Sequence, residues 1–158
     1  SVVFHGYEAG GIQGIIGASD HPVQRISDRY EDYPRSVAEA LRLLRDAGVD
    51  GPYAIALGPR CYAGLTQATE HGYPVIELVR RLIDGPVIWA PAVDGAVVLS
   101  LRGGDFELTV GQDLSIGYDS HDEKNARLFL MESLTFRVLA GEAAVALRYA
   151  EKGSAKRA

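Results

Sequence analysis

Several features that mark whole classes of protein are scarce or absent in this chain of 158 residues. Cys61 is the single cysteine, so no internal disulfide can form, and a cytoplasmic location is predicted. No apolar run approaches the roughly 20 residues of a membrane-spanning helix, so a membrane is not expected as a partner. The net charge is −5 and the one basic concentration is the final "EKGSAKRA", so no nucleic-acid partner is expected either.

The motifs of common catalytic and nucleotide-binding sites are also missing. Gly103, Gly104 and Gly111 are not followed by the Lys-Ser/Thr pair of a phosphate-binding loop, and no G-x-S-x-G or H-E-x-x-H motif occurs. Residues 19–21 read Ser-Asp-His, but a working triad converges from separate segments, so a turn before Pro22 is expected there. The sequence predicts no catalytic residue.

Two groups of residues leave an enzymatic alternative open. Cys61 with His71 would supply a thiol nucleophile and a base, and the loop "DSHDE" around His121 contains carboxylates and an imidazole. No neighbouring group indicates an activated thiolate, and one acidic loop lacks the ligands from several segments that a metal site needs. We therefore predict no metal site and no enzyme, with a hydrolase that uses Cys61 or His121 as the alternative.

Hydrophobic residues make up 47% of the chain, enough for one packed core, and their spacing indicates helices in the first half. Residues 1–33 are expected to be loop with short helical turns. "YPRSVAEALRLLRDAG" predicts a helix with Pro34 in its first turn and Gly48 as its stop. A second helix is expected from Pro59, and a third in "HGYPVIELVRRLIDG", while "YAIALG" predicts a buried strand.

From Pro86 onward apolar residues tend to recur at every second position, which indicates strands. "VIWAP" and "AVVLSL" are predicted strands. "FELTV" alternates, and Leu114 and Ile116 continue the alternation after Gly111, which is expected at a bulge or bend. In "ARLFLMESLTFRVL" apolar residues share one face and Glu132 alone interrupts it. The last run, "AAVALRY", is expected to pair with that strand. An antiparallel sheet after a helical half indicates the α+β class.

The stretch "RGGD" is dense in polar groups but is predicted to be a turn between two strands. Gly103 and Gly104 suit positions that need a positive φ, and Arg102 and Asp105 are expected to pair with each other or with a neighbouring subunit.

Long motifs in this chain resemble those of one known family. "RGGDFELTVGQDLSIGYDSHD", "LFLMESLTFRVL" and "EAAVALRY" are similar to the C-terminal part of encapsulin shell proteins, the family once labelled linocin or bacteriocin-like. "VFHGY", "GVDGPYAIALGPRCY" and "HGYPVIELVRRLIDGPVIWAPAVDGAVVLSLRGGDF" agree in the same order. The resemblance covers nearly everything from Val2 to Tyr149.

The resemblance implies the fold of tailed-phage capsid proteins of the HK97 type, with an axial domain and the C-terminal strands of a peripheral domain. Residues 1–32 would then connect to the peripheral domain, residues 33–101 would form most of the axial domain, and residues 102–149 would return to the peripheral sheet. Residues 150–158 are expected to form a disordered tail.

The same resemblance implies residues at the symmetry axes. Thr69, Glu70, His71, Gly72 and Tyr73 match the loop that lines the five-fold pore, where Glu70 and His71 would set the charge and the response to pH. Some family members bind a flavin near this loop, and Tyr73 is the residue expected to contact it. No other cofactor is expected.

As a function, the resemblance implies a structural subunit that assembles with identical subunits into an icosahedral compartment in the bacterial cytoplasm. Such shells enclose iron-storing ferritin-like proteins or dye-decolourising peroxidases, held through C-terminal targeting peptides on the cargo. An isolated axial-domain binding module is a further alternative. Family members carry a large N-terminal region ahead of the point that matches Val2, so we expect this chain to be a piece or a truncated form of a longer subunit.

Overall fold

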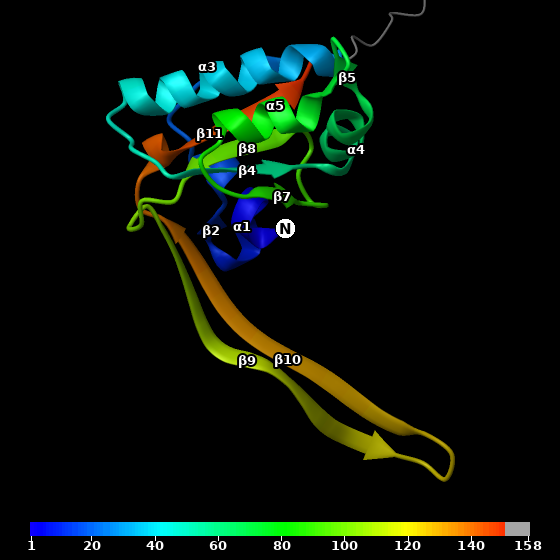
Figure 1. Cartoon of the computed structure of the whole chain (residues 1–158). Coiled ribbons are helices and arrows are strands. Elements are labelled where there is room, and N and C mark those ends of the chain that lie inside the picture. Colours follow the sequence, from blue (N-terminus) through cyan, green and yellow to red (C-terminus); the bar gives the residue numbers. More distant parts are fainter. Residues whose placement is uncertain (151–158) are drawn as a thin grey trace, which may run out of the picture.

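The centre of the structure is a five-stranded mixed sheet whose strands come from distant parts of the chain. The computed structural model describes residues 1–150, so most of the predicted disordered tail, residues 151–158, lies outside the described part. The strand order is β3-β11-β8-β4-β7 (Figure 1). The bounds are β3 (Gln24–Ile26), β4 (Tyr53–Leu57), β7 (Val87–Trp89), β8 (Ala96–Ser100) and β11 (Ala144–Tyr149).

The pairing of the last strand differs from the sequence prediction. β11 runs antiparallel to β8 and parallel to β3, and does not pair with the long strand before it. β4, from the helical first half, lies between β8 and β7. The expected pairing of "AAVALRY" with "ARLFLMESLTFRVL" is therefore wrong. The physical reason is burial: Val145 and Leu147 of β11 are 0% and 1% exposed in the core, a position that the protruding long strand could not give them.

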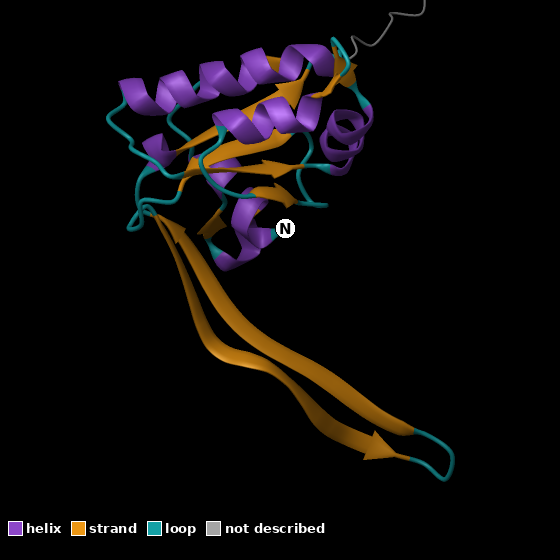
Figure 2. Ribbon diagram, viewed as in Figure 1, coloured by secondary structure: helices purple, strands orange, loops and turns teal. Residues whose placement is uncertain are grey.

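Three helices cover one face of this sheet (Figure 2): α3 (Tyr33–Asp46), α4 (Pro59–Gln67) and α5 (Val75–Leu82). α3 and α4 confirm the predictions, with Pro34 in the first turn of α3 and Gly48 beyond its end at a φ of 74°. None of the helices in residues 1–150 is long and apolar enough to cross a membrane.

The strands of the sheet send alternate side chains into two hydrophobic layers. Ile55, Leu57 and Val98 pack in the layer beneath the helices, whereas Ala56 and Val97 pack in a smaller layer on the opposite face. Because both faces are covered, β4 is buried at all five positions. This explains why "YAIALG" is an unbroken apolar run in place of an alternating one.

The N-terminal segment covers the second face of the sheet. It contains α1 (Val2–His5), a small sheet of β1 (Gly6–Tyr7) and β2 (Ile12–Gln13), and α2 (Ile15–Ala18). Beyond α2, the Ser19 hydroxyl donates a hydrogen bond to the Ala144 carbonyl at 2.7 Å, and a ring nitrogen of His21 bonds the Glu142 carbonyl at 2.8 Å. Ser19 and His21 therefore hold this segment to the start of β11 and form no catalytic triad.

A long antiparallel hairpin leaves one end of the head (Figure 1). It is made of β9 (Phe106–His121) and β10 (Ala126–Val138). Val110 pairs with Leu134 and Gln112 with Ser133, so Gly111 between them has no partner across the ladder. The predicted bulge at Gly111 is confirmed.

We expect Gly95→Ala to destabilise the head far more than Gly48→Ala. Both glycines have positive φ values, 95° and 74°, but a Cβ at Gly95 would lie 2.1 Å from the Leu147 carbonyl oxygen, whereas a Cβ at Gly48 meets nothing within 4 Å. Gly48→Ala should cost about 1 kcal/mol of unfolding free energy from backbone strain alone, and Gly95→Ala clearly more. Urea unfolding of the two variants measures the difference; equal losses would contradict the proposed close approach.

Candidate functional site: the hairpin and its anchor

One face of the hairpin is hydrophobic along most of its length, with Glu132 as an interruption, and is open to solvent. The pairs Leu128–Tyr118, Leu130–Ile116, Leu134–Val110 and Phe136–Leu108 lie on this face in register. Ile116 is 70% exposed and Leu130 is 68% exposed, and only Phe136, at the base, is buried in the head. We call these residues the apolar face of the hairpin. Its opposite side includes the exposed pair Thr109–Thr135 and the pair Glu107–Arg137, in which Glu107 is partly buried.

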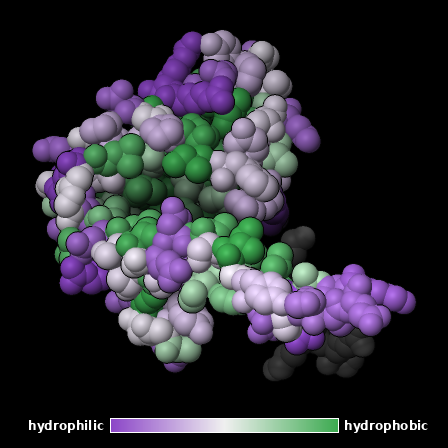
Figure 3. Space-filling model, turned by 90° about the horizontal axis from the view of Figure 1, so that it is seen from below, coloured by the Kyte–Doolittle hydropathy of each residue, from purple (hydrophilic) through white to green (hydrophobic). Residues whose placement is uncertain are grey.

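Hydrophobic side chains also gather on the underside of the head. Figure 3, which views the molecule from below, shows them around a hollow close to the hairpin. Ile88 and Trp89 of β7, the edge strand, are 45% and 56% exposed. Exposed apolar side chains that gather on one side of a molecule are typical of a protein interface, because leaving apolar surface in water is unfavourable by about 25 cal/mol per Å².

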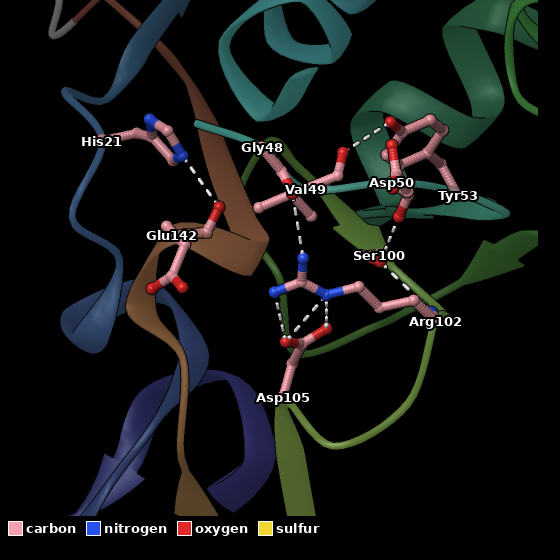
Figure 4. A network of polar contacts seen from close by, with 9 residues as sticks. All are labelled: His21, Gly48, Val49, Asp50, Tyr53, Ser100, Arg102, Asp105 and Glu142. Atoms are coloured by element: carbon pink, nitrogen blue, oxygen red, sulfur yellow. Dashed lines mark hydrogen bonds and ion pairs between the residues drawn. The ribbon is translucent and has the colours of Figure 1, made fainter. Parts of the chain in front are cut away.

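An ion pair at the base of the hairpin fixes where the hairpin begins (Figure 4). Asp105 is 4% exposed, and both of its carboxylate oxygens accept hydrogen bonds from the Arg102 guanidinium at 2.8 to 3.1 Å. The chain can turn back so tightly because Gly103 and Gly104 have φ values of 89° and 82°. The pairing holds the pKa of Arg102 above its usual range. The predicted turn with paired charges is present.

Further contacts join this turn to other segments. The Arg102 guanidinium also donates to the Gly48 carbonyl beyond α3 at 3.2 Å, and the Ser100 hydroxyl donates to the Asp50 carbonyl at 2.7 Å. The Asp105 carbonyl accepts the Leu139 N–H at 2.8 Å, just after β10. We call these contacts the anchor. The sequence did not predict these contacts, because every residue has a backbone carbonyl and the residue type does not show which carbonyl will accept a hydrogen bond.

The predicted pore loop lies at the other end of the head (Figure 1). It is a small hairpin of β5 (Thr69–Glu70) and β6 (Tyr73–Pro74), with His71 and Gly72 at its turn and φ values of 50° and 81°. The Arg81 guanidinium lies 4.9 Å from the centre of the Tyr73 ring and hydrogen-bonds its hydroxyl. The structure thus keeps residues 69–73 and residues 102–105 apart.

Cys61 lacks the surroundings of a nucleophile. It is fully buried in α4, and its sulfur lies 3.2 Å from the Tyr33 hydroxyl and 3.1 Å from the Tyr149 hydroxyl. Burial raises the pKa of the thiol, although the two hydroxyl hydrogen bonds oppose the shift. Burial likewise raises the pKa of Tyr33 and of Tyr149. A neutral thiol between two neutral phenols is a packing arrangement, which argues against the Cys61 hydrolase alternative.

The loop around His121 forms the exposed tip of the hairpin. Asp122 accepts hydrogen bonds from the N–H groups of Lys124 and Asn125, which lower the pKa of its carboxyl. A ring nitrogen of His121 bonds the Tyr118 hydroxyl. Among residues 1–150 no three His, Cys, Asp or Glu side chains are grouped as metal ligands.

Comparison with known proteins places this arrangement in a family. The family model described as "encapsulating protein for peroxidase" matches residues 1–135. The chain is 53% identical over 155 residues to the type 1 encapsulin shell protein of Rhodospirillum rubrum, covering 98% of this chain and 55% of the relative. The chain belongs to the encapsulin shell protein family. It is also 47% identical over 147 residues to the encapsulin shell protein of Mycobacterium tuberculosis, covering 93% of this chain and 56% of that protein. It therefore spans about half the length of the curated encapsulins that it matches.

Solved structures agree on the fold. The virus-like particle from Pyrococcus furiosus matches with a TM-score of 0.61 at 19% identity, over 78% of this chain and 55% of that one. The capsid of an empty GTA particle matches with a TM-score of 0.59 at 13% identity, over 94% of this chain and 65% of that one. The encapsulin chain thus has the predicted α+β capsid fold of the HK97 type.

We expect Asp105→Ala to lower the free energy of unfolding by about 2 kcal/mol, because the guanidinium N–H groups of Arg102 lose the buried carboxylate that accepts their hydrogen bonds. Glu107→Ala is the matched control: it removes a partly exposed ion pair with Arg137, which should contribute less than about 1 kcal/mol. Chemical unfolding measures both. Similar losses for the two variants would contradict the importance of the anchor.

The raised pKa of Cys61 predicts slow reaction of its thiol with iodoacetamide in the folded chain at pH 7 and at pH 9. The thiolate is the reactive form, and the raised pKa keeps it scarce above the pH at which a free cysteine ionises. Labelling followed by mass spectrometry, with the urea-unfolded chain as control, checks this. Rapid labelling of the folded chain at pH 7 would instead restore Cys61 as a candidate nucleophile.

Proposed function

We propose that this chain forms part of the structural subunit of an encapsulin shell, a closed particle built from identical subunits. The observation that carries the proposal is its 45–53% identity to several type 1 encapsulin shell proteins over more than nine-tenths of its length. The apolar face of the hairpin supports it, since such a face is stable in water only when other protein covers it. A shell subunit acts through interfaces and needs no catalytic group.

We extend the proposal to the surroundings of the shell. The compartment would lie in the bacterial cytoplasm and enclose a cargo enzyme, a ferritin-like protein or a dye-decolourising peroxidase, held by a C-terminal targeting peptide. Thr69 to Tyr73 would line the five-fold pore, because this small hairpin projects from the end of the head. Tyr73 remains the proposed flavin contact: the residue is 42% exposed and the Arg81 guanidinium lies over its ring, an arrangement that suits a planar ligand. The division into peripheral and axial segments also remains a prediction.

Electron microscopy with light scattering, on the protein at its natural length, tests the proposal. We expect closed particles of uniform size. A preparation that contains only small species would contradict the assignment to a shell.

The apolar face gives a second test with a matched control. Ile116→Asp with Leu130→Asp places two charges on this face and should reduce particle yield at least about tenfold, because a charge is costly to bury in an interface. Thr109→Asp with Thr135→Asp places the same charges on the opposite side of the hairpin, where both residues are exposed, and should reduce the yield much less. Equal effects would show that the apolar face has no special part in assembly.

A further inference from the structure

Two arginines lie side by side at one edge of the central sheet. Arg25 of β3 is in register with Arg148 of β11, and both side chains are exposed. Like charges on adjacent strands destabilise a sheet. Within residues 1–150 neither arginine forms an ion pair with an acidic side chain. This arrangement is unfavourable in the isolated head and would become favourable if an anion bound between the two guanidinium groups.

The backbone at this edge is free as well. β3 is the outermost strand, and in the described part of the chain no strand pairs with its outer side. Hollows of about 550 and 340 Å³ lie along it; Arg25 lines both, Arg35 of α3 lines the larger and Arg148 the smaller. The side chain of Arg35 is 84% exposed and 3.9 Å from its nearest acidic partner, Asp32. We call Arg25, Arg35, Arg148 and the outer side of β3 the basic edge.

The hairpin has the opposite charge. Residues 106–138 contain six acidic and three basic side chains, and three of the acidic ones lie between Asp119 and Glu123 at the tip. Asp119 is 3.9 Å from its ion-pair partner Arg127, and its side chain is 51% exposed. Figure 1 shows the hairpin running away from the head, so its tip lies far from the basic edge of the same copy.

We propose that the acidic tip of the hairpin of one copy binds the basic edge of a neighbouring copy, where the end of β9 extends the sheet at β3 and Asp119 and Glu123 pair with Arg25 and Arg148. An extended segment that adds to a free strand edge gains backbone hydrogen bonds, and the charges fix its register. The contact joins two different surfaces, so repeating it builds a closed ring where the rotation between copies closes, and an open filament where it does not. This inference rests on the proposed function, because it requires neighbouring copies.

Charge reversal on the protein at its natural length tests the contact. Arg25→Glu with Arg148→Glu should reduce particle yield at least about tenfold, because it sets like charges against the tip. Asp119→Arg with Glu123→Arg should do the same, and the four changes combined in one chain should restore most of the yield. Arg45→Glu with Arg80→Glu, two exposed arginines elsewhere on the head, is the control and should assemble like the unchanged protein. Circular dichroism verifies that each variant is folded.

Each outcome bears on a different proposal. If the Arg25 and Arg148 reversal assembles as well as the control, the contact is wrong while the shell function stands. If that reversal blocks assembly and the four-fold combination does not restore it, the basic edge binds something other than the tip, which also overturns the inference. If the unchanged protein forms no particles, the proposed function itself fails.

Discussion

The direction of the hairpin depends on one buried carboxylate. Asp105 is almost completely removed from water, and a charged carboxylate in that position requires a positive partner. Arg102 supplies it from three residues away, across the turn at Gly103 and Gly104, and also binds the carbonyl that follows α3. The start of β9 and the end of β10 are thereby joined to the same point of the head, so a 33-residue projection has a fixed origin.

The anchor joins two parts of the molecule that differ in how well their apolar residues are covered. The head is covered on both faces of its sheet and buries its own core, whereas the apolar face of the hairpin remains open. In a shell subunit this division has a purpose: the head keeps its fold while the hairpin provides surface for other protein. The same reasoning explains why polar residues cluster near the anchor: their hydrogen bonds hold separate segments of the chain together.

Local signals predicted much of this structure correctly. Pro34 and Gly48 bracket α3 as expected, because a fixed φ suits a first helical turn and glycine tolerates the positive φ beyond the end. Gly111 marks the bulge, and Gly103 with Gly104 marks the turn. These local signals did not show which strands pair when the strands lie far apart in the sequence. β11 was assigned to the wrong neighbour, because an apolar strand such as "AAVALRY" fits any covered sheet position and its sequence does not say which.

The sequence did not predict that β9 pairs with β10. It did indicate α3, α4 and α5, the strand segments of β4, β7, β8 and β11 and, through the resemblance, the family. These features depend on residue spacing and on glycine and proline, all of which act over a few neighbours. The tertiary structure decided that β4 and β11 flank β8, that Arg102 reaches Gly48, and that Arg25 lies beside Arg148. Each of these contacts joins residues at least 39 positions apart, and only the folded chain brings them together.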